Sequence, residues 1–192
     1  MHHHISLNRE ARADIQWWMD FLPHWTARSV IPPSREIMST DLLLYTDASD
    51  IGFGALFGTK WIQGAWPKTE AKVSIDYREL FAITAAALTW GHSWEGLRIV
   101  FVTDNKPISQ VWDSGSTSSR PLMSLIRPLY LFAAKTGFCI SFKHIFGTSN
   151  PLADALSRSQ MEKFFGLMPR ADRTPTALPD SVLNLLKQPS TP

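Results

Sequence analysis

Cysteine is almost absent from this sequence: Cys139 is the single one in 192 residues. One cysteine excludes an internal disulfide and a cysteine-rich zinc site, so we expect a reducing setting, cytoplasmic or nuclear. The chain also lacks a run of about eighteen apolar residues, so neither a membrane span nor a membrane partner is predicted. Residues 1–6 have neither the basic nor the apolar region of a secretory signal, and secretion is not expected.

Charge is scarce as well. Charged residues make up 19% of the chain, and the formal net charge is only +2. This balance excludes a polybasic nucleic-acid-binding arm, while the 44% of hydrophobic residues is enough for a sizeable core and excludes bulk disorder. The sequence contains neither the Gly-x-Ser-x-Gly motif of many serine hydrolases nor the Gly-x-x-x-x-Gly-Lys phosphate loop.

Apolar periodicity and turn residues predict an α/β protein. Strands are expected over 42–46, 50–57, 61–66, 97–103 and 138–145, and helices over 6–22, 76–91, 108–112, 120–135, 151–161 and 180–187. The first three strands should form a meander within a mixed sheet that has helices on its faces. We divide the chain into an N-terminal helix and connector (1–40), a main domain (41–165) and a Pro-rich, flexible C-terminal tail (166–192).

Acidic residues fall at the ends of these elements. Asp47 and Asp104 end the first and fourth strands, Glu79 lies in the first turn of the long helix, and Asp154 lies early in the helix from 151. Functional groups of α/β proteins gather where strands end and helices begin. Clustered carboxylates repel one another unless cations hold them, and oxygen ligands without His or Cys select Mg²⁺ or Mn²⁺. Each acid alone is equally explained by turn capping or by the helix dipole.

Five segments together resemble the ribonuclease H (RNase H) domains of retrotransposon reverse transcriptases, of the DIRS-like and gypsy-like kinds. They are 45–49 (YTDAS) with 52–55 (GFGA), 77–83 (YRELFAI), 102–105 (VTDN), 144–158 (HIFGTSNPLADALSR) and the leader 7–11 (LNREA). The four acids follow one another at intervals of 32, 25 and 50 residues, in the order found in the family. The resemblance covers about residues 7–170.

The resemblance implies a ribonuclease H-like fold, with a five-stranded mixed sheet whose first three strands are antiparallel. It implies an endoribonuclease that cleaves the RNA strand of RNA–DNA hybrids with two Mg²⁺ ions, for which Mn²⁺ can substitute. Asp47 would bridge the ions, Asp154 would help to hold the one that activates water, and Glu79 and Asp104 would hold the one beside the leaving 3′ oxygen. The expected partners are the hybrid and a polymerase domain in the same or a partner chain.

Contacts with nucleic acid are expected from Ser49, Gly52 and Asn105. The glycines around Phe53 allow close backbone approach to a ligand, although a strand bulge explains them equally well. The sequence departs from many cellular RNases H, because the loop 147–150 has no histidine and the segment 113–121 has no basic helix. Two alternatives remain: an idle relic or interaction module derived from a retroelement, and a nuclease or transposase that cuts DNA.

Overall fold

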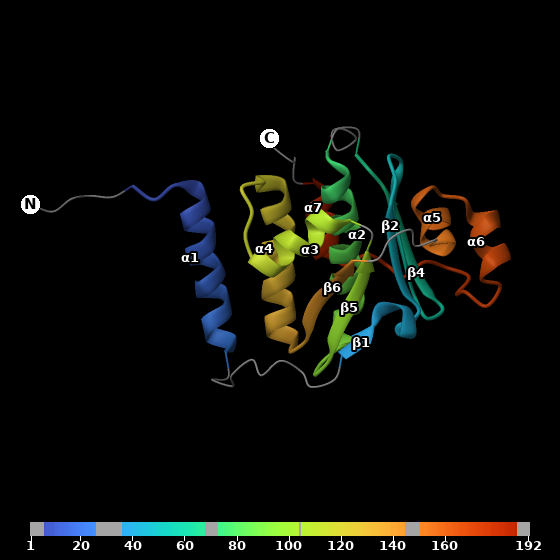
Figure 1. The fold of residues 1–192 in the computed structure, drawn as a ribbon, viewed down its shortest axis with the longest axis horizontal. Coiled ribbons are helices and arrows are strands. Elements are labelled where there is room, and N and C mark those ends of the chain that lie inside the picture. Colours follow the sequence, from blue (N-terminus) through green and yellow to red (C-terminus); the bar gives the residue numbers. More distant parts are fainter. Residues whose placement is uncertain (1–5, 26–35, 68–72, 104, 145–149, 188–192) are drawn as a thin grey trace, which may run out of the picture.

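The structure, a computed structural model, describes residues 6–25, 36–67, 73–103, 105–144 and 150–187. Its strands are β1 (Glu36–Met38), β2 (Leu44–Ala48), β3 (Gly52–Phe57), β4 (Lys60–Ala65), β5 (Arg98–Thr103) and β6 (Cys139–His144). Its α-helices are α1 (Arg9–Phe21), α2 (Ile75–Trp90), α3 (Lys106–Ser114), α4 (Arg120–Thr136), α5 (Pro151–Ser157), α6 (Met161–Leu167) and α7 (Asp180–Lys187). Figure 1 shows α4 on one side of the strands and α5 and α6 on the other, with α2 between α4 and the meander β2-β3-β4.

The described strands form two sheets, not one. The order β2-β3-β4 is an antiparallel meander, as predicted, whereas β1-β5-β6 is a separate parallel sheet. The predicted single five-stranded mixed sheet is therefore wrong, and with it the ribonuclease H-like fold that the resemblance implied. The chain is an α/β protein with three strands in each sheet.

The split has its origin in a strand that periodicity did not predict. β1 lies in the segment expected to be a connector, and it pairs in parallel with β5 from the Glu36–Arg98 pair onward. A 3-10 turn over Ser39–Leu42 then leads the chain away, and Leu43 adopts a left-handed conformation with φ 50° before β2 begins. Because β1 and β6 are the hydrogen-bonded neighbours of β5, β2 has β3 as its one partner among the described strands.

Side-chain caps begin most of the helices at the expected places. Ser74, Asn105, Ser119 and Asn150 each accept a hydrogen bond from a backbone N–H in the first turn of α2, α3, α4 and α5 respectively. Three of these helices also have proline in the first turn, where no backbone donor is needed. α4 continues unbroken through Pro128.

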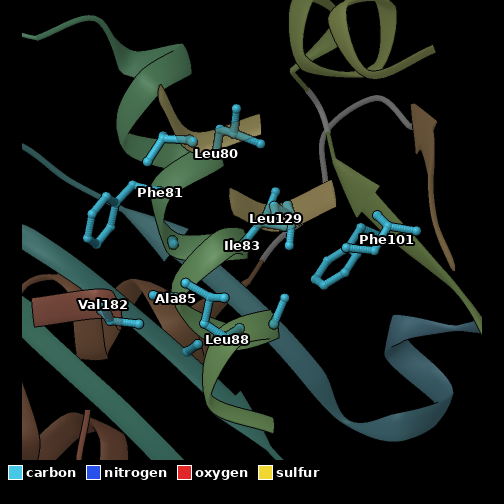
Figure 2. Packing of buried hydrophobic residues seen from close by; sticks show 14 of the residues in the cluster. Leu80, Phe81, Ile83, Ala85, Leu88, Phe101, Leu129 and Val182 are labelled. Atoms are coloured by element: carbon cyan, nitrogen blue, oxygen red, sulfur yellow. The ribbon is translucent and has the colours of Figure 1, made fainter. Parts of the chain in front are cut away.

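The main core lies around α2, which is apolar on nearly every side. Eleven of its residues are buried. Figure 2 shows Leu80, Ile83 and Leu88 of this helix among Leu129 of α4 and Phe101 of β5. A helix that is buried all round holds its neighbours in place, and here α2 packs against the meander, α4 and α7 at once.

The C-terminal segment belongs to the packed body rather than to a flexible linker. The backbone N–H groups of Asp172 and Thr176 donate to the carbonyls of Thr59 and Trp61, and the Trp61 indole donates to the Asp172 carbonyl at 2.7 Å. Val182 of α7 is fully buried against α2. Residues 171–187 therefore continue the fold that was predicted to end near 165.

The N-terminal helix α1 is held by few contacts. The Trp17 indole donates to the carbonyl of Arg127 in α4, and the Arg127 guanidinium pairs with Asp14 at 2.8 Å. Several large apolar side chains of this helix remain exposed to solvent, among them Trp18 and Met19, which are 54% and 61% exposed. Within the described ranges, none of the helices has the length and apolar character needed to cross a membrane.

Candidate active site

Asp47 lies one residue before the end of β2, on the face of the meander that α5 covers. It stands opposite Gly54 of β3, which in turn stands opposite Gln63 of β4. Cross-strand partners share a face, and a Cβ added to Gly54 would meet Leu156 and Ser157 of α5. The cross-strand partners Asp47, Gly54 and Gln63 therefore face α5.

The approach of α5 to the meander is unusually close at Gly54. The added Cβ would lie 2.3 Å from the Leu156 Cβ and 2.7 Å from the Ser157 backbone nitrogen. Only a residue without a side chain fits between strand and helix here. The second glycine of the predicted motif thus admits α5, and the strand pairs regularly through it without a bulge.

Hydrogen bonds join the end of α5 to β2. The Ser157 hydroxyl donates to Oδ2 of Asp47 at 2.5 Å, and the Ser49 hydroxyl donates to the Ser157 carbonyl at 2.9 Å. At the other end of the helix, the Asn150 amide donates to the carbonyl of Thr46 at 2.9 Å. Segments that are more than 100 residues apart in the sequence are thereby fixed beside the Asp47 carboxylate.

Asp154, in the first turn of α5, is held by two cations. Arg158 Nε donates to its Oδ1 at 2.7 Å, and Lys163 Nζ donates to its Oδ2 at 3.1 Å. The hydrogen bond from Arg158, with a smaller contribution from Lys163, holds the pKa of Asp154 below its ordinary value. Arg158 also lies 3.9 Å from Asp50. The negative charges of Asp154, Asp47 and Asp50 raise the pKa of its guanidinium. Arg158 therefore pairs with Asp154, and its positive charge also acts on the nearby Asp47.

Glu79 belongs to the helix on the opposite face of the meander. Phe53, next to Gly54 in β3, contacts Phe81 of α2 with ring centroids 5.0 Å apart, so α2 and α5 cover opposite faces. Because α2 begins at Ile75, Glu79 lies in its second turn, and the acid of the first turn is Asp76.

The structure does not bring the predicted carboxylates together as a set. In the part of the chain it describes, no three His, Cys, Asp or Glu side chains are grouped closely enough for a metal site. Of the four predicted acids, Asp104 lies outside the described residues, as do residues 145–149 of the closing motif. Among the predicted acids, the absence of a metal site is therefore tested only for Asp47, Glu79 and Asp154. Of these, Asp47 and Asp154 lie on β2 and α5, which are in contact.

The residues predicted to contact nucleic acid have internal partners. Ser49 is buried, and its Oγ accepts from the backbone N–H groups of Ile51 and Gly52. A Cβ on Gly52 would lie 2.2 Å from the Gly64 carbonyl oxygen, so this glycine admits β4. Asn105 caps α3 through Oδ1 and donates from Nδ2 to Asp76 at 2.8 Å. Their contact with nucleic acid stays a prediction.

Three side chains at this place have roles that sequence reasoning did not assign. They are Ser157, Arg158 and Lys163. The spacing of four residues between Asp154 and Arg158 on a helix is a signal for an ion pair and could have been used. No local pattern points to Ser157, whose partner lies 110 residues away.

The donor chemistry at this place fits a hard divalent cation. Asp47 and Asp154 offer carboxylate oxygens, the ligands that Mg²⁺ prefers. Arg158 pairs with Asp154 and acts electrostatically on Asp47. Comparisons with protein-family models, with curated proteins and with solved structures find no match for this chain.

Proposed function

We propose that the chain is an RNase H-type endoribonuclease that cleaves the RNA strand of RNA–DNA hybrids, as part of a retroelement reverse transcriptase. The observation that carries the proposal is the hydrogen bond between Ser157 and Asp47, together with the packing of α5, which carries Asp154, against β2. These contacts join two segments that resemble separate catalytic motifs of that family.

Asp47 and Asp154 are the described residues that would hold Mg²⁺, and Glu79 and Asp104 complete the set that the resemblance implies. When bound, the ions would polarise the scissile phosphate and activate a water molecule. The chain supplies the carboxylates, and α5 fixes one of them in place through Ser157. Arg158 and Lys163 carry positive charge beside the same carboxylates and suit a phosphodiester backbone.

The test is cleavage of a labelled RNA–DNA hybrid in Mg²⁺, beside duplex DNA and duplex RNA. We expect the RNA strand of the hybrid alone to be cut, and Asp47→Asn to abolish cutting. Asp41→Asn is the matched control, because it removes one exposed carboxylate from the 3-10 turn that precedes β2. Cutting of duplex DNA would favour a DNA nuclease instead. Absence of cutting in Mg²⁺ and in Mn²⁺ would refute the proposal for the isolated chain.

A second candidate is an interaction module that has lost catalysis. It is favoured by α1, where Ile15, Trp18, Met19 and Leu22 recur at helical spacing and are each about half exposed. Large apolar side chains gathered on one helix face are typical of a protein contact. This candidate predicts that Asp47→Asn leaves the biological function of the chain unchanged, whereas Trp18→Ser and Met19→Ser impair it.

A further inference from the structure

The strongest unassigned feature near the candidate site is the hydroxyl of Ser157. Its side chain belongs to a residue that is only 1% exposed, in the last turn of α5. A buried hydroxyl must find a hydrogen-bond partner, because an unpaired one costs about 1–3 kcal/mol. Ser157 has two acceptors in reach, Oδ2 of Asp47 at 2.5 Å and the carbonyl of Asp154 at 3.1 Å.

The hydroxyl has one proton, and the carboxylate is the better acceptor. Hydrogen bonds from a hydroxyl to an ionised oxygen are short, about 2.5–2.7 Å, and roughly twice as strong as neutral ones. The Ser157 hydroxyl lies within hydrogen-bond distance of Oδ2 of Asp47. The carbonyl of Asp154 is the ordinary partner of a serine three residues later in a helix, and would satisfy Ser157 without any contact with β2.

Ser157 is itself held in place from outside its helix. The Ser49 hydroxyl donates to its carbonyl, and the absence of a side chain at Gly54 lets its backbone approach β3. The donor that meets Asp47 is thus fixed by β3, by the end of β2 and by the helix to which it belongs. A carboxylate whose partner is rigid is itself restricted in rotation.

We infer that Ser157 is a positioning residue, which orients the carboxylate of Asp47 for a divalent cation. This inference rests on the metal-holding role proposed for Asp47. Outer-shell partners of metal ligands typically contribute about 10–100-fold to metal affinity or activity. Removal of the Ser157 hydroxyl should therefore weaken Mg²⁺ binding at β2 while leaving the fold in place.

The experiment is a Mg²⁺ titration of the whole chain followed by the backbone amide signals of β2 in ¹H–¹⁵N spectra, a readout that does not require cleavage. The variants are Ser157→Ala, which removes the hydroxyl, and Ser157→Thr, which keeps it. Thr84→Val is the matched control, because Thr84 is a fully buried hydroxyl that donates only to Leu80 within α2. Thermal unfolding of each variant is recorded in parallel.

We expect Ser157→Ala to raise the dissociation constant for Mg²⁺ by about tenfold or more. Ser157→Thr should restore most of the affinity. Thr84→Val should lower the melting temperature but leave the dissociation constant for Mg²⁺ unchanged. Equal Mg²⁺ affinity of Ser157→Ala and the unmodified chain would overturn the inference, and so would an unmodified chain whose β2 signals do not respond to Mg²⁺. Mg²⁺ binding that depends on Ser157, without cleavage of any hybrid, would support the inference while refuting the proposed activity.

Discussion

Replacement of Gly54 by alanine tests the central packing contact of the candidate site. The added Cβ would lie 2.3 Å from the Leu156 Cβ, which is 1.1 Å short of the 3.4 Å at which ordinary contact begins. It would also lie 2.7 Å from the backbone nitrogen of Ser157, which cannot rotate away. The clash can therefore be relieved only if α5 moves away from β3.

The movement of α5 away from β3 should lower the stability of the fold and change the geometry of the site. Overpacking of this kind costs typically about 1–3 kcal/mol. For a chain of this length each kcal/mol lowers the melting temperature by about 2–4 °C, so we expect a loss of roughly 2–12 °C. A shift of 1.1 Å along the contact would also stretch the 2.5 Å bond between Ser157 and Asp47 to about 3.6 Å, beyond hydrogen-bond distance.

The assay is thermal unfolding by circular dichroism, with Gly166→Ala as the matched control. Gly166 lies in α6 with nothing within 4 Å of an added Cβ. Alanine there should stabilise the helix by about 0.5–1 kcal/mol, because glycine is the poorer helix former. Replacement of glycine by alanine is thus expected to lower the melting temperature at position 54 and to raise it at position 166. A melting temperature of Gly54→Ala equal to that of the unmodified chain would refute the close contact between β3 and α5.

Three further predictions test other parts of the structure. Val182→Ala should lower the free energy of unfolding in urea by roughly 2 kcal/mol, because it removes buried methyl groups from the contact of α7 with α2; no loss would contradict the packing of the C-terminal segment. Pro128→Ala should raise the same free energy by about 1 kcal/mol or more, since it restores a donor within α4; a decrease would show that the ring is needed for packing. The lowered pKa of Asp154 should stabilise the fold at pH values above the ordinary pKa of 3.8, and this contribution should disappear as the pH falls through the lower folded-state pKa; because the side chain is one-third exposed, Asp154→Asn should lower the free energy of unfolding by only about 0.5 kcal/mol at pH 7, and this difference should vanish in acid.

Helices and strands could be predicted well where a local pattern of apolar side chains determines their bounds. The meander and α2 are found within one or two residues of their predicted bounds. The tail was predicted to be a linker because it contains many prolines, yet its contacts with Trp61 and α2 are tertiary and leave no periodic signal in so short a segment. α4 was expected to be interrupted, but the burial of Leu125, Ile126 and Leu129 against α2 outweighs the donor that Pro128 lacks.

The sheet arrangement could not be predicted, because it depends on three residues. β1 is only Glu36–Met38, shorter than the window in which alternation can be recognised. Its pairing with β5 becomes apparent only when both strands are placed in space. A connector that contains a short strand then changes one expected sheet into two.

In the candidate site too, features set by the local sequence could be predicted, whereas features set by tertiary contacts could not. The position of each acid at the end of a strand or in an early turn of a helix is a local property, and Asp47, Glu79 and Asp154 lie within the predicted elements. Which of them share a face depends on the register of β2 with β3, since a slip of one residue would turn Asp47 toward α2.

Small residues decide which of these acids can meet. α5 reaches β3 only because Gly54 has no side chain, and this approach is what brings the Ser157 hydroxyl to Asp47 and Arg158 within the field of both aspartates. The glycines around Phe53 were explained equally well by close approach to a ligand or by a strand bulge, and at Gly54 the space is occupied by a helix of the same chain. The Mg²⁺ binding proposed for Asp47 and the packing of this fold therefore depend on the same glycine, and any substitution that separates α5 from β3 should impair Mg²⁺ binding and stability together.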